Sequence, residues 1–297
     1  MQARGWIRII DEILDANHLA PGRSSKLAGK LSWVGAQLFN RIGRAMLRPL
    51  FDQKTRRDGA MNNELRRALQ WWKRILSEDI AEKRLWMQDV RPPAHMFCDA
   101  RGHPAHVAAV LYIDGGVYWA HMQPAASIIE LFRARRDNQI MGLELLSISL
   151  GLNSFAQMIA GRNLIIHSDN SGSEVCLRSQ HSRISVCSCA YILQVALRRG
   201  TARAMDHAQL VHEQWLSLAL LGCSVHVKRV GTHDNIADLP SREDFRILRA
   251  RKTIEVHPQL SCAFECPETW EALKERWDAF QTQDKTAQLP CLNVAYR

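Results

Sequence analysis

The order of the elements predicted after residue 93 constrains the fold more than any other feature of the sequence. The predicted strands are short runs of apolar or β-branched residues: 96–99, 107–113, 117–121, 163–168 and 224–230. The predicted helices follow the third strand or lie between later strands: 138–158, 173–178 and 188–221. Three consecutive strands joined by the hairpin turn Asp114-Gly115-Gly116, followed by alternating helices and strands, predict an α/β fold. Its mixed five-stranded sheet should carry helices on both faces.

A separate helical region precedes this sheet. Its third helix is predicted from the apolar residues Leu65, Leu69, Trp72 and Leu76, which recur at helical spacing. The consecutive prolines in Arg91-Pro92-Pro93 end helices and stiffen linkers, so the best boundary lies there. The predicted organisation has three parts: a helical region over 1–92, the α/β domain over 93–250, and an extension of unknown role over 251–297.

The charge of the chain favours a polyanionic partner. The formal net charge is +9, and basic residues greatly outnumber acidic ones in the helical region. Arg41, Arg44 and Arg48 are candidate contacts to nucleic-acid phosphates, although a solvated helical surface would have the same composition. No apolar run approaches the roughly 20 residues that span a bilayer, and the N-terminus lacks a secretory pattern. We therefore expect an intracellular protein, cytoplasmic or nuclear, without a membrane partner.

Four acidic residues are the candidate catalytic and metal-binding groups. Asp99 and Asp169 close strands, Glu144 lies on or beside the buried stripe of its helix, and Asp238 begins the final helix. Singly, each has a plain explanation as a turn residue, a helix cap or half of an ion pair. Together at one edge of the sheet, they would repel one another without cations. Two Mg²⁺ ions about 4 Å apart could activate water and stabilise the leaving oxygen in phosphodiester cleavage.

The four acids also stand in motifs that resemble those of ribonuclease H domains. The motifs are Phe97-Cys98-Asp99-Ala100-Arg101-Gly102, Ile140-Met141-Gly142-Leu143-Glu144-Leu145-Leu146, His167-Ser168-Asp169-Asn170 and Asn235-Ile236-Ala237-Asp238-Leu239-Pro240-Ser241-Arg242. The last is similar to the form found in retroelement polyproteins. All four acids of the family's metal site occur in order, and the resemblance covers residues 95–245. It implies a ribonuclease H-like arrangement of the sheet and helices.

The resemblance also implies a substrate, which is the RNA strand of an RNA/DNA hybrid. Asp99, Glu144, Asp169 and Asp238 would hold two Mg²⁺ or Mn²⁺ ions that activate water for attack on phosphorus. Recognition would depend on backbone contacts and on the 2′-hydroxyl that distinguishes RNA from DNA. Asn170 would contact the substrate backbone near the metals. His233 has two interpretations, as a proton shuttle or as an exposed loop histidine.

The segment before the sheet extends the resemblance. Lys26–Ser32 and Arg41–Leu50 are similar to the thumb and connection region that follows a reverse transcriptase palm, and retrotransposons of the tyrosine-recombinase type look closest. The aspartate-bearing palm motif itself is absent from the 297 residues. The chain therefore resembles the C-terminal part of a retroelement polyprotein, and a polymerase palm would have to be supplied by another chain.

Three alternatives remain open from the sequence. The first is a ribonuclease H-like module that binds nucleic acid without cleaving it. The second is another metal-dependent nuclease of the same superfamily, a transposase or an exonuclease; exonucleases usually begin with two acids one residue apart, whereas Asp99 is followed by Ala100 and Arg101. The third is a helical adaptor built on the first 90 residues, which would leave the four acids unexplained.

Overall fold

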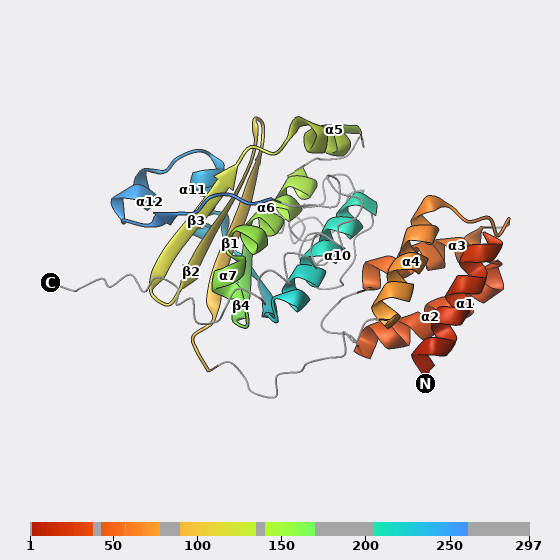
Figure 1. Ribbon diagram of the computed structural model, residues 1–297. Helices are drawn as coiled ribbons and strands as arrows, with labels where there is room; N and C mark the ends of the chain where they lie inside the picture. Colours follow the sequence, from red (N-terminus) through yellow and green to blue (C-terminus); the bar gives the residue numbers. More distant parts are fainter. Residues whose placement is uncertain are drawn as a thin grey trace, which may run out of the picture.

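The computed structural model describes residues 2–37, 43–56, 58–77, 90–134, 140–169 and 205–260. Figure 1 shows a sheet flanked by helices, with the N-terminal helices grouped to one side. None of the helices in these ranges combines the length and the apolarity needed to traverse a membrane. The helices predicted over 173–178 and over the first part of 188–221 lie outside the described residues.

The N-terminal residues are helical, as predicted. Leu65, Leu69 and Trp72 are buried, so the predicted stripe does face a core. The Trp72 indole N–H also donates to the Met46 carbonyl at 3.2 Å, which joins the helix that contains Trp72 to the helix that contains Met46. In the part of this region that the structure describes, the helices are α1 Gln2–Ala16, α2 Pro21–Gln37, α3 Arg44–Thr55 and α4 Asn63–Ser77.

Over the described residues the sheet is mixed and has six strands, in the order β5-β4-β1-β2-β3-β6. β1 and β2, and β2 and β3, pair antiparallel, whereas β4 is parallel to both β1 and β5. The predicted count of five is wrong because the short β6 pairs in parallel with β3. Two residues are too few to show an alternating pattern in a sequence. The strands are β1 Ala94–Gly102, β2 Ala105–Ile113, β3 Gly116–Met122, β4 Asn163–Asp169, β5 Ser224–Val230 and β6 Ile254–Glu255.

Helices cover both faces of the sheet (Figure 1). On one face, α6 (Ile140–Ser154) packs against β1 and β2 and is itself covered by α10 (Met205–Leu220). Met96 and Cys98 of β1 belong to the core on this side. On the other face, α11 (Asp238–Ser241) contacts β1 and β2, and Phe97 packs beside it. The alternation along β1 therefore assigns successive side chains to opposite layers.

The helix α6 differs from its prediction. A single apolar stripe was expected, but every residue from Met141 to Leu152 is buried, because the sheet lies on one side of the helix and α10 on another. The helix predicted over 138–158 is also divided, since α7 (Ala156–Ile159) is a separate turn. Glu144 therefore lies inside a helix that is surrounded by protein, which makes its charge harder to accommodate than the sequence indicates.

Two further elements depart from the predictions. Between the predicted strand 117–121 and the predicted helix 138–158, where no helix or strand was predicted, the chain forms the helix α5 (Ala126–Ala134), which buries Ile128 and Phe132 four residues apart. The single final helix is in fact two short ones, α11 and α12 (Arg246–Ala250). Glu243 lies between them at φ 61°, in the left-handed region, so the helix cannot continue through it.

Candidate metal centre

Asp99, Glu144 and Asp169 converge at one end of the parallel strands. Each offers a carboxylate oxygen, and these three oxygens lie within 4.8 Å of one another. Cys98 of β1 lies opposite Ser168 of β4, so the residues that follow them, Asp99 and Asp169, lie side by side. Asp169 ends β4 as predicted, but the prediction that Asp99 also closes a strand is wrong, because β1 stays paired with β2 as far as Gly102. Glu144 comes from α6. The three residues are only 5%, 8% and 9% exposed, respectively, so the group is largely shielded from water.

The surroundings disfavour the ionised form of all three acids. The pKa of Asp99 is raised from its ordinary value of 3.8 to about 7, chiefly by burial and also by the charges of Asp169 and Asp238, against a hydrogen bond from Ser241. Burial also raises the pKa of Glu144 well above its ordinary value, with added repulsion from Asp99 and Asp169. The pKa of Asp169 is raised by burial and lowered by a hydrogen bond from Thr232. Near neutral pH the group therefore needs protons or a cation.

One oxygen of this group has no partner in the described part of the chain. Glu144 Oε2 is fully buried, and no described donor lies within hydrogen-bond distance of it. A buried carboxylate oxygen without a donor is costly, and a cation is the partner that would remove the cost of all three charges at once. Three carboxylates are a donor set that hard divalent cations prefer. The group can therefore hold a metal ion.

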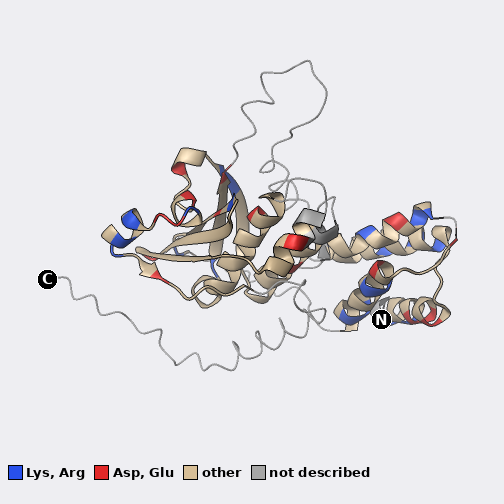
Figure 2. Ribbon diagram, turned by 90° about the horizontal axis from the view of Figure 1, so that it is seen from above, with Lys and Arg blue, Asp and Glu red and all other residues tan. Residues whose placement is uncertain are grey.

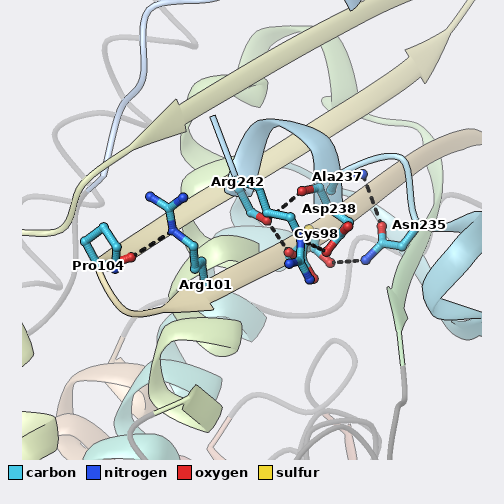
Figure 3. A network of polar contacts seen from close by, with 9 residues as sticks. Cys98, Arg101, Pro104, Asn235, Ala237, Asp238 and Arg242 are labelled. Atoms are coloured by element: carbon cyan, nitrogen blue, oxygen red, sulfur yellow. Dashed lines mark hydrogen bonds and ion pairs between the residues drawn. The ribbon is translucent and has the colours of Figure 1, made fainter. Parts of the chain in front are cut away.

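Asp238, the fourth predicted acid, is not part of this group. Its Oδ1 accepts a hydrogen bond from Arg242 Nε at 2.7 Å, and its side chain is 26% exposed (Figure 3). It nevertheless lies close enough for its charge to raise the pKa values of Asp99 and Asp169. The structure thus brings three of the four predicted acids together and places the fourth beside them, paired with an arginine.

The segment around Asp238 is fastened to β1 by polar contacts (Figure 3). The buried Asn235 amide donates to the Cys98 carbonyl at 3.1 Å and accepts from the Ala237 N–H at 3.3 Å. The Ser241 hydroxyl donates to the Asp99 carboxylate. These contacts hold the start of α11 against the strand that carries Asp99.

Sequence reasoning missed the roles of Thr232, Asn235, Ser241 and Arg242. Three of them stand inside the fourth motif, but only Asp238 was singled out there. The spacing was a usable signal, since Ser241 and Arg242 follow Asp238 by three and four residues and therefore share one side of a helical turn with it.

We expect Asn235→Ala to destabilise the protein by about 1–3 kcal/mol, because the Cys98 carbonyl loses its buried donor. Chemical denaturation measures this loss. The matched control is Asn153→Ala, which removes an amide that donates to Ser149 within α6. Equal and small effects of the two substitutions would contradict an anchoring role for Asn235.

The other predicted site residues have mixed outcomes. Arg41 and Asn170 lie outside the described residues. His233 is exposed in the short helix η1 (Thr232–Asp234), and it is Thr232 of the same helix that hydrogen-bonds to Asp169. Arg44 and Arg48 lie on α3, which packs against α10. Arg48 is also 3.5 Å from Asp52.

Comparisons with known proteins add no family to these observations. No protein-family model matches the chain, and a search of curated proteins gives no match. The resemblance of the four motifs therefore stays a prediction, and the function has to be inferred from the geometry and chemistry of the site.

Proposed function

We propose that residues 93–250 form a ribonuclease H-like domain that cleaves the RNA strand of RNA/DNA hybrids with Mg²⁺ or Mn²⁺. The observation that carries this proposal is the buried group of Asp99, Glu144 and Asp169, with an unpartnered oxygen on Glu144. Two further features support it. The acids occur in the order of the family's motifs, and they project from β1, α6 and the end of β4 in a mixed sheet covered on both faces.

Each polar residue of the site has a role in this proposal. Asp99, Glu144 and Asp169 are the metal ligands, and Asp238 is the fourth. Ser241 and Thr232 orient the carboxylates of Asp99 and Asp169 by hydrogen bonds. When bound, two divalent ions would supply activation of water and stabilisation of negative charge at the phosphate.

Substrate binding is proposed to extend to the helical region. Figure 2 shows Lys and Arg along the N-terminal helices, where Arg44 and Arg48 would contact phosphates together with Arg41. Asn170 and His233 would contact the substrate near the carboxylates. We propose that the chain belongs to, or derives from, a retroelement reverse transcriptase whose polymerase palm is a separate partner. Selection of RNA would rest on its 2′-hydroxyl groups.

A cleavage assay tests the proposal directly. An RNA/DNA hybrid labelled on the RNA strand should be cut internally in the presence of Mg²⁺ or Mn²⁺ and left intact in EDTA, and a DNA duplex should not be cut. Stepwise shortening of a DNA end would instead indicate an exonuclease.

A second candidate function is a catalytically inactive module that binds nucleic acid. One observation favours it: Asp238 is paired with Arg242 and stands outside the group of three acids. Binding of the hybrid without cleavage, with either metal ion present, would support this alternative.

A further inference from the structure

Arg242 is a basic side chain, among the described residues, whose charge acts on the acidic group. It follows Asp238 by one helical turn, and its Nε donates to Asp238 Oδ1 at 2.7 Å (Figure 3). Its positive charge also acts on Asp99 and Asp169, and in each case it lowers the pKa that burial raises. Arg242 thus already provides part of the positive charge that the four acids require.

We propose that Arg242 is a displaceable counter-cation, which pairs with Asp238 in the metal-free site and releases it when divalent ions bind. The inference rests on the proposed function, since it concerns the same acids. It accounts for the position of the fourth acid: Asp238 is held outside the group by a neighbouring guanidinium and is not missing from the site. Once released, the guanidinium is available to a phosphate of the substrate, for which its planar donor pair is well suited.

Because the Arg242–Asp238 pair is exposed, breaking it costs little free energy. The Arg242 side chain is 63% exposed and that of Asp238 is 26% exposed. Water competes for both charges of such a pair, so its net contribution to stability is small. A buried pair would instead leave an uncompensated charge when it broke.

The compensation that Arg242 provides is also incomplete. Arg242 hydrogen-bonds to Asp238, whereas Glu144 Oε2 is buried with no donor among the described residues. A guanidinium carries one positive charge, and four neighbouring carboxylates would carry four negative charges when ionised. A divalent cation among the carboxylates compensates more of this charge, and Asp238 gains by joining it.

A second pair, between Arg246 and Asp244, shows what an ordinary surface pair looks like in the same segment. Its N–O distance is also 2.7 Å, and its side chains are 89% and 30% exposed. Arg246 is not among the charges that act on Asp99 or Asp169. Arg246→Gln is therefore a matched control for Arg242→Gln, since it removes the same charge and breaks a similar pair away from the acids.

The first test measures binding of Mn²⁺ to the full chain, by electron paramagnetic resonance of the free ion. Arg242→Gln removes a repulsive charge and frees Asp238, so we expect Mn²⁺ to bind about tenfold more tightly at low ionic strength. Arg246→Gln should bind Mn²⁺ as the unmodified protein does. If saturating Mn²⁺ is supplied, Arg242→Gln should also bind the hybrid more weakly, because the phosphate loses the released guanidinium.

The second test needs no substitution in the protein that is measured. The Nε–Hε resonance of Arg242, assigned by its absence in Arg242→Gln, should shift as Mg²⁺ is added, and its proton should exchange faster with water. The resonance of Arg246, which donates from Nε to Asp244 Oδ1 at 2.9 Å, should stay unchanged.

The outcomes separate the two proposals. If the unmodified protein shows no saturable binding of Mn²⁺, the metal site and the nuclease function fail together. The unmodified protein could instead bind Mn²⁺ while Arg242→Gln binds it no more tightly and the Arg242 resonance does not move with Mg²⁺. In that case the proposal that divalent ions displace Arg242 from Asp238 is wrong, while the nuclease proposal stands.

Discussion

Asp169→Asn should abolish cleavage of the RNA strand while leaving binding of the hybrid largely intact. The substitution removes a negative oxygen from the group of three acids but keeps the size of the side chain. Loss of one preorganised electrostatic contact at a reacting phosphate costs on the order of 10³-fold in rate. Binding should change little, because it depends mainly on contacts to the phosphate backbone. Single-turnover cleavage and hybrid affinity, measured on the same preparations, give the two values.

Asp244→Asn is the matched control for this substitution. It makes the same chemical change to a carboxylate that pairs with Arg246 outside the group, and it should retain full cleavage. The stability of Asp169→Asn should not fall, because the raised pKa of Asp169 shows that its charge is disfavoured where it lies. Cleavage that persists in Asp169→Asn with added Mg²⁺ would rule out the metal centre.

Local patterns in the sequence were sufficient for much of the sheet. Asp114 and Gly115 have positive φ, as the predicted hairpin turn requires, and they join β2 to β3 as expected. Where tertiary packing decides, the patterns were insufficient. α5 is short, and among its described side chains Ile128 and Phe132 are buried one turn apart. α6 is buried on every side, so it lacks the amphipathic stripe on which prediction relies.

The candidate site, like the fold, could be predicted only in part from the sequence. Asp99 and Asp169 were expected together because each was predicted to end a strand; Asp169 does end β4, whereas Asp99 lies inside β1 and is brought beside Asp169 by the parallel register of the two strands. The partner of Asp238 could not be predicted. A carboxylate at the start of a helix can bind a metal ion or pair with a basic residue one helical turn later. Only the three-dimensional structure shows which partner it has.

The raised pKa of Asp99 leads to a second large effect, on stability in the absence of metal. The folded protein holds this proton up to about pH 7, whereas the unfolded chain releases it near 3.8. The stabilising contribution of the neutral form is therefore complete below pH 3.8 and is lost as the pH rises through about 7. Above that pH the ionised, buried carboxylate opposes folding, and bound divalent ions would reverse the effect.

Asp99→Asn should consequently stabilise the metal-free protein at about pH 8, by up to roughly 4 kcal/mol, and much less at about pH 5. The amide stays neutral at both pH values, and its oxygen can still accept the hydrogen bond from Ser241. Denaturation in EDTA at the two pH values measures this gain. Added Mg²⁺ should stabilise the unmodified protein at the higher pH and have little effect on Asp99→Asn, because that variant lacks a ligand.

The sign of the stability change caused by the Asp→Asn substitution distinguishes Asp99 from an ordinary surface acid. Asp244 has the opposite shift, since its hydrogen bonds with Arg246 lower its pKa to about 2. Asp244→Asn should therefore lose stability near neutral pH, by a small amount because the pair is exposed. If Asp99→Asn behaves in the same way and loses stability at high pH without metal, Asp99 is already well compensated by the protein alone. The acids would then have no need of a divalent cation, and the physical basis for a metal centre would be gone.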